Sequence, residues 1–272
     1  MPQPPSKMRI AVLVSGGGTN LQAMIDKSAA GVLLADIAVV LSDRPDAYGL
    51  ARAGKAGIPA YCVDYKSMKA EGARIDAEGK FPVDLEELDR RQKILKNPDG
   101  AERRRRLAGL VHAEREMARI IDSYQVDYVC LAGFMRLVTP WFIGHYNTGG
   151  ARRILNIHPA LLPSFPGQHG YEDTFAYGCK WGGITVHFVD EGEDTGPIIA
   201  QAVYPILPDD DTDKVRSRGL QLEYEVYSQV INWLSGGFVN LDEFPDGRTR
   251  VSVTDPAYRE TLKSWMRLVD PA

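Results

Sequence analysis

Short apolar runs alternate with segments of helical periodicity along most of the chain. Helical spacing of apolar residues is found at 20–29, 46–56 and 213–234. Strands are predicted at 9–14, 36–41, 128–131, 153–157, 185–189 and 198–203. The first four strands are rich in Val, Ile and Leu and are separated by helices or crossovers, which is typical of parallel strands buried on both faces. The last two are interpreted as a later addition, with an antiparallel arrangement left open. The pattern predicts an α/β fold with a mostly parallel twisted sheet and flanking helices.

A charged stretch of helical character interrupts this alternation after the second predicted helix. It is much longer than the few residues that usually join a strand to a helix, so we interpret about 66–116 as a helical insertion, with a helical stretch predicted over 84–96. Its apolar residues can dock on the domain or on a second subunit, which leaves a homo-oligomer open, and we expect docking without chemistry. Residues 1–7 are predicted to be a disordered Pro-rich tail, 8–239 one domain, and 240–272 a tail packed on that domain.

Composition narrows the class of protein. The chain has 272 residues and a formal net charge of −4, which gives no electrostatic reason to expect nucleic acid as a partner. We see no apolar run long enough to cross a bilayer and no signal-peptide pattern, so we expect a cytoplasmic protein without a membrane partner. Three widely spaced cysteines, Cys62, Cys130 and Cys179, argue against disulfides, and no metal site is predicted.

A glycine-rich loop, Ser15-Gly16-Gly17-Gly18-Thr19-Asn20, joins the first strand to the first helix. Backbone N–H groups and the helix dipole favour an anion at such a position. Thr19 and Asn20 can add side-chain donors, and Gly18 permits close approach of the backbone. The loop lacks the Lys-Ser/Thr ending of an ATP-binding loop and the spacing of a dinucleotide site. A small phosphate group is therefore the favoured ligand, while a plain tight turn with a helix cap is the alternative.

Polar residues cluster in sequence where later strands end. Asn156 and His158 lie two apart at the end of a predicted strand, so they share one face at the sheet edge where α/β proteins bind ligands. An amide and an imidazole together can polarise a carbonyl, stabilise an oxyanion and move protons. Asp194 lies in an acidic loop just before Gly196-Pro197 and is placed to support the charge of a histidine. These three residues are the candidate catalytic set, and the chemistry they favour is acyl transfer.

Four stretches occur in a fixed order: VLVSGGGTNLQAMID, LAGFMRLVTPWFI, ILNIHPALLPSFPGQH and GITVHFVDEGEDTGPIIAQ. Together they resemble the phosphoribosylglycinamide formyltransferases, also called glycinamide ribonucleotide transformylases, a folate-dependent family of purine synthesis. The resemblance implies a Rossmann-like formyltransferase fold. It further implies transfer of the formyl group of 10-formyltetrahydrofolate, the cosubstrate, to the amine of glycinamide ribonucleotide, without a metal.

The resemblance also implies roles for individual residues. Asn156, His158 and Asp194 match the catalytic set, and Asn156 additionally faces the folate. Gly18, Thr19, Asn20 and Glu223 match positions that bind the ribonucleotide, the first three at its phosphate. Met135, Arg136, Leu137 and Val138 match the segment that holds the folate pterin, and Leu162-Pro163 matches a cis peptide bond.

Two departures from the family pattern leave alternatives open. An arginine that the family uses near its substrates falls within 66–116, where Arg103, Arg104, Arg105 and Arg106 are all candidates, and Tyr224 follows Glu223 where the family usually has His. A formyltransferase acting on another amine, or a 10-formyltetrahydrofolate hydrolase, would share the catalytic pattern. The glycine-rich loop favours a small phosphorylated substrate over tRNA.

Overall fold

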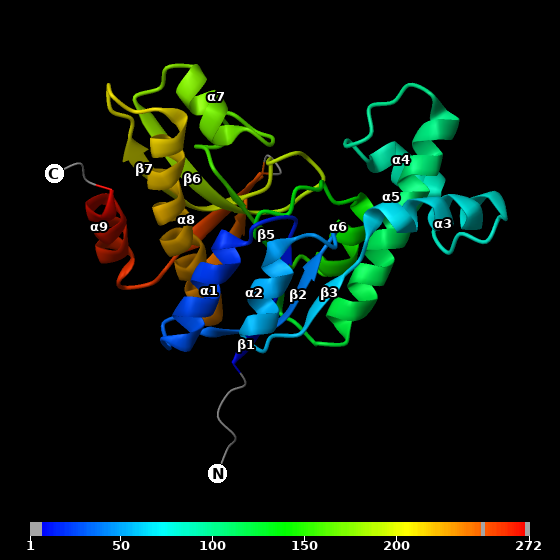
Figure 1. Cartoon of the computed structure of the whole chain (residues 1–272), viewed down its shortest axis with the longest axis horizontal. Helices are drawn as coiled ribbons and strands as arrows, with labels where there is room; N and C mark the ends of the chain where they lie inside the picture. Colours follow the sequence, from blue (N-terminus) through cyan, green and yellow to red (C-terminus); the bar gives the residue numbers. More distant parts are fainter. Residues whose placement is uncertain (1–6, 246–247, 270–272) are drawn as a thin grey trace, which may run out of the picture.

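A seven-stranded sheet with helices on both faces forms the body of the protein in this computed structural model, which describes residues 7–245 and 248–269 (Figure 1). The strands of this sheet are β1 (Met8–Val14), β2 (Ala35–Ser42), β3 (Ala60–Cys62), β4 (Tyr128–Leu131), β5 (Ile154–His158), β6 (Trp181–Phe188) and β7 (Ile198–Pro205). Of the tail predicted at 1–7, only Lys7 lies within the described residues.

The order of the strands across the sheet is β3-β2-β1-β4-β5-β6-β7. Strands β1 to β5 are parallel, whereas β6 is antiparallel to both β5 and β7. The predicted α/β fold is confirmed, and the two late strands are an antiparallel addition. Because the chain leaves β1 toward β2 and later returns to β4 on the other side, the carboxyl ends of β1 and β4 form a topological switch point, where such sheets bind ligands.

One face of the sheet is covered by three helices, which Figure 1 shows in front of the strands. They are α1 (Thr19–Ala29), α2 (Tyr48–Lys55) and α8 (Thr212–Ser235). Alternate residues of β1, namely Ile10, Val12 and Val14, point to this face and are fully buried with Leu21 and Tyr227 from the helices. Burial of each such aliphatic side chain is worth roughly 1.5–3 kcal/mol, so this layer fixes α1 and α8 against the strands that carry the site.

The opposite face is covered by the second half of α5 (Gly100–Asp122) and by α6 (Pro140–Tyr146). Ala11 and Leu13 of β1 point to this side and pack with Met117 and Phe142. The strict alternation along β1 therefore separates two cores, as expected for a strand buried on both faces.

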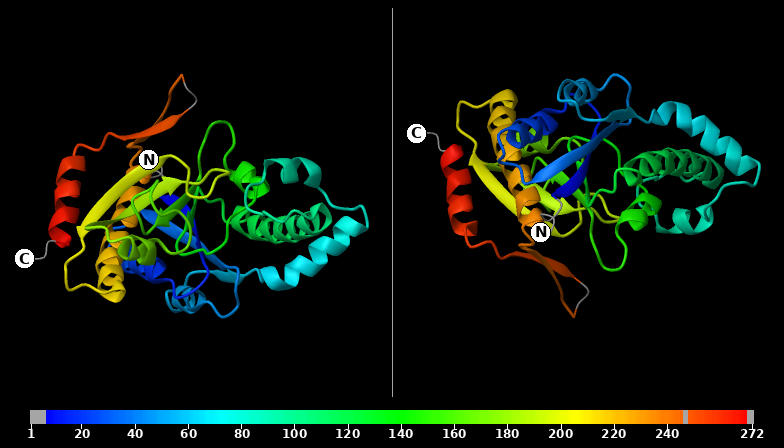
Figure 2. Two further views of the ribbon diagram at one scale, coloured as in Figure 1. Left: turned by 90° about the horizontal axis from the view of Figure 1, so that it is seen from above. Right: turned by 90° about the horizontal axis from the view of Figure 1, so that it is seen from below.

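The insertion forms a lobe beside the sheet, and Figure 2 shows it extending away from the strands on the side opposite the last helix, α9 (Tyr258–Leu268). It contains α3 (Tyr65–Ala77), α4 (Leu85–Arg91) and the first half of α5. Leu85 and Leu88 pack with Leu107 and Val111 in a core of their own, which also touches Trp141 of α6. A helical stretch was predicted over 84–96, but α4 ends at Arg91, and the chain continues as an irregular segment to Asp99.

The chain after α8, which the sequence left without an assigned structure, forms a hairpin and a helix. The hairpin consists of β8 (Val239–Glu243) and β9 (Thr249–Val253), and the helix is α9 (Tyr258–Leu268). Trp265 of α9 is buried against Trp233 of α8. The sequence also gave no indication of α7 (Gly170–Ala176). None of the helices within the described residues is long and apolar enough to span a membrane.

Candidate active site

The glycine-rich loop turns from β1 into α1 at the switch point. Gly18 has φ 67°, and a Cβ there would lie 2.8 Å from the Cα of Gly49, so both the conformation and the contact require glycine. Helix α1 begins at Thr19, and no side chain caps its first N–H groups. Since the first N–H groups of a helix have no partner within it, this end of α1 is available to an anion.

Asn20 is held at the start of α1 by a buried carboxyl group of α8. Its Nδ2 donates to Glu223 Oε2 over 2.5 Å, and the hydroxyl of Tyr171 donates to Glu223 Oε1. Burial raises the pKa of Glu223, and the bonds from Tyr171 and Asn20 oppose that rise. The Oδ1 of Asn20 is buried and has no hydrogen-bond partner within the described structure. A buried acceptor of this kind is expected to meet a donor, which here points to a ligand.

A second polar network joins the glycine-rich loop to the segment after β4. Asp43 accepts from Ser15 Oγ over 2.6 Å and from Arg136 Nε over 2.6 Å, and the backbone N–H of Met135 donates to Ser15 Oγ over 2.8 Å. These bonds fix the backbone of 135–138. Met135 and Leu137 nevertheless remain 51% and 40% exposed, which leaves apolar surface for a flat apolar ligand.

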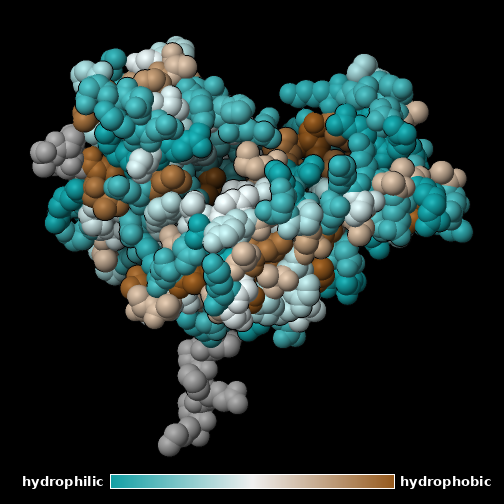
Figure 3. Space-filling model, in the orientation of Figure 1, coloured by the Kyte–Doolittle hydropathy of each residue, from teal (hydrophilic) through white to brown (hydrophobic). Residues whose placement is uncertain are grey.

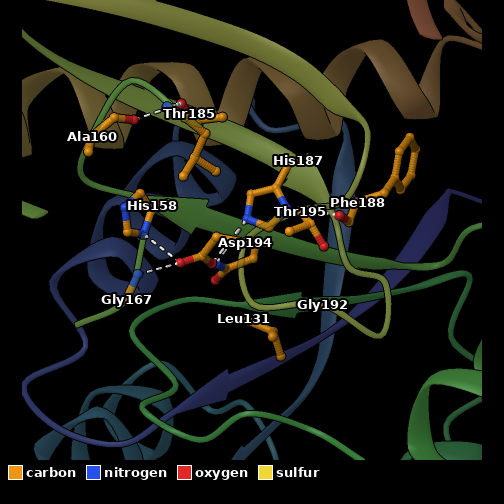
Figure 4. A network of polar contacts seen from close by, with 12 residues as sticks. Leu131, His158, Ala160, Gly167, Thr185, His187, Phe188, Gly192, Asp194 and Thr195 are labelled. Carbon is orange, nitrogen blue, oxygen red and sulfur yellow. Dashed lines mark hydrogen bonds and ion pairs between the residues drawn. The ribbon is translucent and has the colours of Figure 1, made fainter. Parts of the chain in front are cut away.

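The predicted catalytic residues meet at the end of β5, where Figure 4 shows Asp194 between His158 and His187. Asn156 and His158 lie on the same side of β5, and the antiparallel register places His187 of β6 opposite Asn156. Asp194 Oδ2 lies 3.3 Å from His158 Nδ1, and Asp194 Oδ1 lies 3.6 Å from His187 Nε2. The Nδ2 of Asn156 is 3.2 Å from His187 Nε2 and 3.4 Å from Asp194 Oδ1. The four side chains therefore form one connected cluster.

Backbone carbonyls set the proton positions on the two histidines. His158 Nε2 lies 2.7 Å from the carbonyl oxygen of Phe165, and His187 Nδ1 lies 2.8 Å from that of Phe188, so each of these nitrogens carries a proton. The remaining nitrogen of His158 faces Asp194. Burial lowers the pKa of His158, while the charge of Asp194 opposes that shift. His158 is thus neutral near pH 7 but has a carboxylate ready to stabilise its protonated form.

The loop after β6 aims Asp194 into this cluster. Asp194 has φ 54°, a left-handed conformation that aspartate tolerates, and its Oδ2 accepts the N–H of Gly167 over 2.8 Å. A Cβ at Gly196 would lie only 1.8 Å from the Phe188 carbonyl oxygen, so only glycine allows the chain to pass there. Burial alone would raise the pKa of Asp194. The bonds to His187 and Gly167 and the histidine charges instead hold that pKa below its usual value.

One cleft of about 540 Å³ collects these groups, and Figure 3 shows a notch with apolar residues exposed in it between the side that carries α7 and the side that carries α4. Every residue of the predicted site except Gly18 lines it: Thr19, Asn20, Met135, Arg136, Leu137, Val138, Asn156, His158, Asp194 and Glu223. Across the described ranges, no group of three or more His, Cys, Asp or Glu side chains is placed to hold a metal ion.

The candidate arginines of the insertion lie elsewhere. Arg103 pairs with Asp89, Arg104 with Asp76, and Arg105 is exposed. None of 103–106 is among the residues that line the cleft. Arg103 and Arg104 instead hold the helices of the insertion together, because their acidic partners lie on α4 and α3, whereas Arg105 pairs with Glu102 of its own helix.

The cleft is also lined by residues that sequence analysis did not single out, among them Ile94, Tyr171, His187 and Arg216. The alternation of side chains along the predicted strand 185–189 could have identified His187 as a candidate. Residues two apart in a strand lie on the same face, so His187 shares a face with Thr185. Ile94 belongs to the insertion, whose irregular segment after α4 contributes this side chain to the wall of the cleft. That the insertion docks without taking part in the chemistry stays a prediction.

Comparison with known proteins identifies relatives of the whole domain. A family model described as formyl transferase matches residues 8–231. The chain is 33% identical over 236 residues to the phosphoribosylglycinamide formyltransferase of Escherichia coli, with 87% of this chain and 91% of that protein covered.

Two further relatives differ in how much of their length the chain matches. The chain is 36% identical over 233 residues to a trifunctional purine biosynthetic protein of Drosophila melanogaster, which covers 85% of this chain but only 14% of that protein. The crystal structure of glycinamide ribonucleotide transformylase 1 from Symbiobacterium toebii superposes with a TM-score of 0.70 at 36% identity. That match covers 94% of this chain and 98% of the other.

Proposed function

Because the chain belongs to the formyl transferase family, we propose that it transfers the formyl group of 10-formyltetrahydrofolate to the primary amine of glycinamide ribonucleotide in purine biosynthesis. The observation that carries this proposal is the cluster of Asn156, His158, His187 and Asp194 in the middle of one cleft. The uncapped start of α1 and the apolar surface of 135–138 line the same cleft.

The ribonucleotide fits the side of the cleft formed by α1 and α8. Its phosphate binds the N–H groups at the start of α1, with Gly18 providing close approach and Thr19 adding a hydroxyl. Asn20 offers its unpaired Oδ1 to a donor of the same substrate. Glu223 orients the Asn20 amide and lines the cleft beside it. This arrangement supports a substrate with one small phosphate and several hydrogen-bond donors.

The formyl donor fits the other side. Met135 and Leu137 present exposed apolar side chains, and Arg136 and Val138 complete the segment, so the pterin ring of the folate has a flat apolar surface with backbone groups at its edge. Asn156 lies between this segment and the histidines and can reach the formyl oxygen.

The chemistry follows from the cluster. The amine nitrogen attacks the formyl carbon, a C–N bond forms, and the carbonyl oxygen becomes an oxyanion that accepts a hydrogen bond from Asn156 Nδ2. Neutral His158 accepts the proton that the amine loses at Nδ1, the nitrogen that faces Asp194, and Asp194 stabilises the resulting imidazolium, whose charge in turn stabilises the oxyanion. The proton passes to N10 of the folate, directly or through a water, as the bond between the formyl carbon and N10 breaks. Tetrahydrofolate and the formylated amide are the products.

The contact between Asn156 Nδ2 and Asp194 Oδ1 is long, at 3.4 Å, and is therefore weak. When a formyl oxygen enters, Asn156 can exchange its contacts with Asp194 and His187 for that oxygen.

An absorbance assay for deformylated folate tests the proposal. Run with glycinamide ribonucleotide present and then absent, it should show product only when the amine is present. Equal product without the amine would mean hydrolysis of the donor, and product with another amine alone would mean a different acceptor.

We also propose that the reaction takes place in the cytoplasm. Cys62 is a free, exposed thiol, and Cys130 and Cys179 are also unpaired, which suits a reducing compartment. Fractionation of the native source with antibody detection tests this location.

A further inference from the structure

The segment after α4 is held in one shape by its own polar groups. Gln92 Oε1 accepts the backbone N–H groups of Ile94 and Leu95 over 3.0 and 2.7 Å, and Gln92 Nε2 donates to the Leu95 carbonyl over 3.2 Å. These three bonds close a compact turn. The turn separates two apolar neighbours, because Leu95 packs into the core of the insertion while Ile94 lines the cleft.

The turn is also fixed to the rest of the insertion. Arg103 of α5 forms two bonds of 2.7 Å with Asp89 of α4 and a third, of 2.9 Å, with the Asn97 carbonyl. Bidentate arginine–carboxylate pairs combine strength with a defined geometry. Since α5 continues into the core under the sheet, Ile94 stands at a fixed place relative to the domain.

A charged contact crosses from the insertion to the loop that carries Asp194. Arg91, the last residue of α4, forms an ion pair with Glu191, and it also pairs with Glu87 one turn earlier. Glu191 lines the cleft, and its loop is tied down by Asp190, which accepts from Gly192 N and Thr195 Oγ1. The insertion and the acidic loop therefore meet across the open side of the cleft.

We propose that the insertion supplies the outer wall of the donor's half of the cleft, with Ile94 as a donor-binding residue and the Arg91–Glu191 pair as a positioning pair. This inference rests on the proposed function. A reduced folate carries an aromatic aminobenzoyl ring next to N10, and the apolar side chain of Ile94 packs on that ring, while 135–138 hold the pterin. The pair keeps the acidic loop, and with it Asp194, against the insertion.

Truncation of Ile94 tests the wall. Ile94→Ala should raise the Kd for tetrahydrofolate, measured by calorimetry, about fivefold or more, because most of a buried aliphatic side chain is lost from the contact. The KM for glycinamide ribonucleotide should stay within twofold. Leu95→Ala is the matched control, since it removes a similar volume from the same turn outside the cleft and should lower the Tm without changing this Kd. An unchanged Kd in Ile94→Ala, or equal increases in both variants, would overturn the proposal.

Charge reversal tests the positioning pair. Arg91→Glu should raise the Kd for tetrahydrofolate about two- to fivefold, as expected for a partly exposed ion pair, and a second change, Glu191→Arg, should restore it. No effect of Arg91→Glu, or no rescue by the second change, would overturn the role of the pair.

The wild-type protein separates this inference from the proposed function. If it binds tetrahydrofolate and transfers formyl groups to the amine while Ile94→Ala behaves like wild type, only the inference fails. If the wild-type protein neither binds tetrahydrofolate nor formylates the amine, the proposed function fails and the inference fails with it.

Discussion

Asp194 concentrates the chemistry of the site at one carboxylate. It is the shared partner of His158 and His187, and it accepts the N–H of Gly167. The depressed pKa of Asp194 keeps the carboxylate charged, and burial keeps His158 neutral in the free protein. The pair is therefore poised to take up one proton only while the reaction proceeds.

Asp194→Asn should lower the pKa of His158 further, because the carboxylate charge is what opposes the effect of burial. Titration of the imidazole signals by NMR measures this shift, and His158→Gln identifies the signal. The same variant should reduce kcat by about 10²–10⁴-fold, the usual size of an acid–base contribution. A raised pKa of His158 in Asp194→Asn, or a near-normal kcat, would contradict the proposed role of the pair.

Asn20 is predicted to act on one substrate only. Asn20→Ala removes the unpaired Oδ1 and leaves Glu223 without one of its two donors, so the KM for glycinamide ribonucleotide should rise roughly tenfold or more. The Kd for tetrahydrofolate should stay within twofold, which calorimetry can check. Thr19→Ala should show a smaller change in the same direction. Equal losses of affinity for both ligands would rule out a dedicated substrate side.

Sequence reasoning could predict the residues of the site that sit on local motifs. Asn156 and His158 are recognisable because they end a strand two residues apart, and the glycine-rich loop because it joins a strand to a helix. Arg216 and Tyr171 gave no such signal. Each lines the cleft only because α8 and α7 pack on each other and on β6, and a single sequence does not contain that packing.

At the scale of elements, segments with a clear apolar pattern were predictable, including the four-residue strand β4, whereas two short segments without one were not. Strand β3 has three residues and pairs only with β2 at the edge of the sheet, and α7 has seven residues. Segments of this length hold too few residues to show a period. The end of α4 was misplaced for a different reason. The side chain of Gln92 accepts the backbone N–H groups of Ile94 and Leu95, so these groups do not form the bonds of a further helical turn. The spacing of apolar residues does not reveal such a side-chain contact.

One contact between two elements makes stability depend on pH. Glu114 of α5 is fully buried and accepts the backbone N–H of Thr139, the N-cap residue of α6, over 2.7 Å. Its other oxygen bonds the Thr139 hydroxyl. Burial raises the pKa of Glu114 from 4.5 to about 8, against the effect of the Thr139 bonds. The carboxyl group therefore keeps its proton in the folded protein up to about pH 8.

The free energy of unfolding should consequently fall as pH rises from about 5 to 8, since the unfolded chain releases this proton near pH 4.5 and the folded protein retains it. One proton gives a slope of at most about 1.4 kcal/mol per pH unit. Urea denaturation at pH 5, 6, 7 and 8 measures the free energy of unfolding of the wild-type protein and of Glu114→Gln. The value for the wild type minus the value for Glu114→Gln should decrease as the pH rises, because the variant has no proton to release at this position. Parallel curves for the two proteins would show that Glu114 is ionised in the folded state.

At the scale of the whole molecule, the last helix completes a core that the site depends on indirectly. Trp265 of α9 and Trp233 of α8 are 4% and 1% exposed, with ring centroids 5.7 Å apart, and Trp233 Nε1 donates to Asp255 over 2.7 Å. Helix α8 also carries Glu223, more than two turns earlier. The C-terminal segment thus stabilises the helix that orients Asn20 without itself lining the cleft.

Trp265→Ala should therefore lower the free energy of unfolding by about 3–5 kcal/mol, the usual cost of removing a large buried aromatic side chain. Urea denaturation followed by circular dichroism measures this loss. Met266→Ala, at a neighbouring position that is 64% exposed, should change the free energy by less than about 0.5 kcal/mol. At a temperature where Trp265→Ala is fully folded, its kcat and both KM values should match wild type. A folded variant with a raised KM for the ribonucleotide would mean that α9 sets the position of Glu223 directly, through a shift of α8.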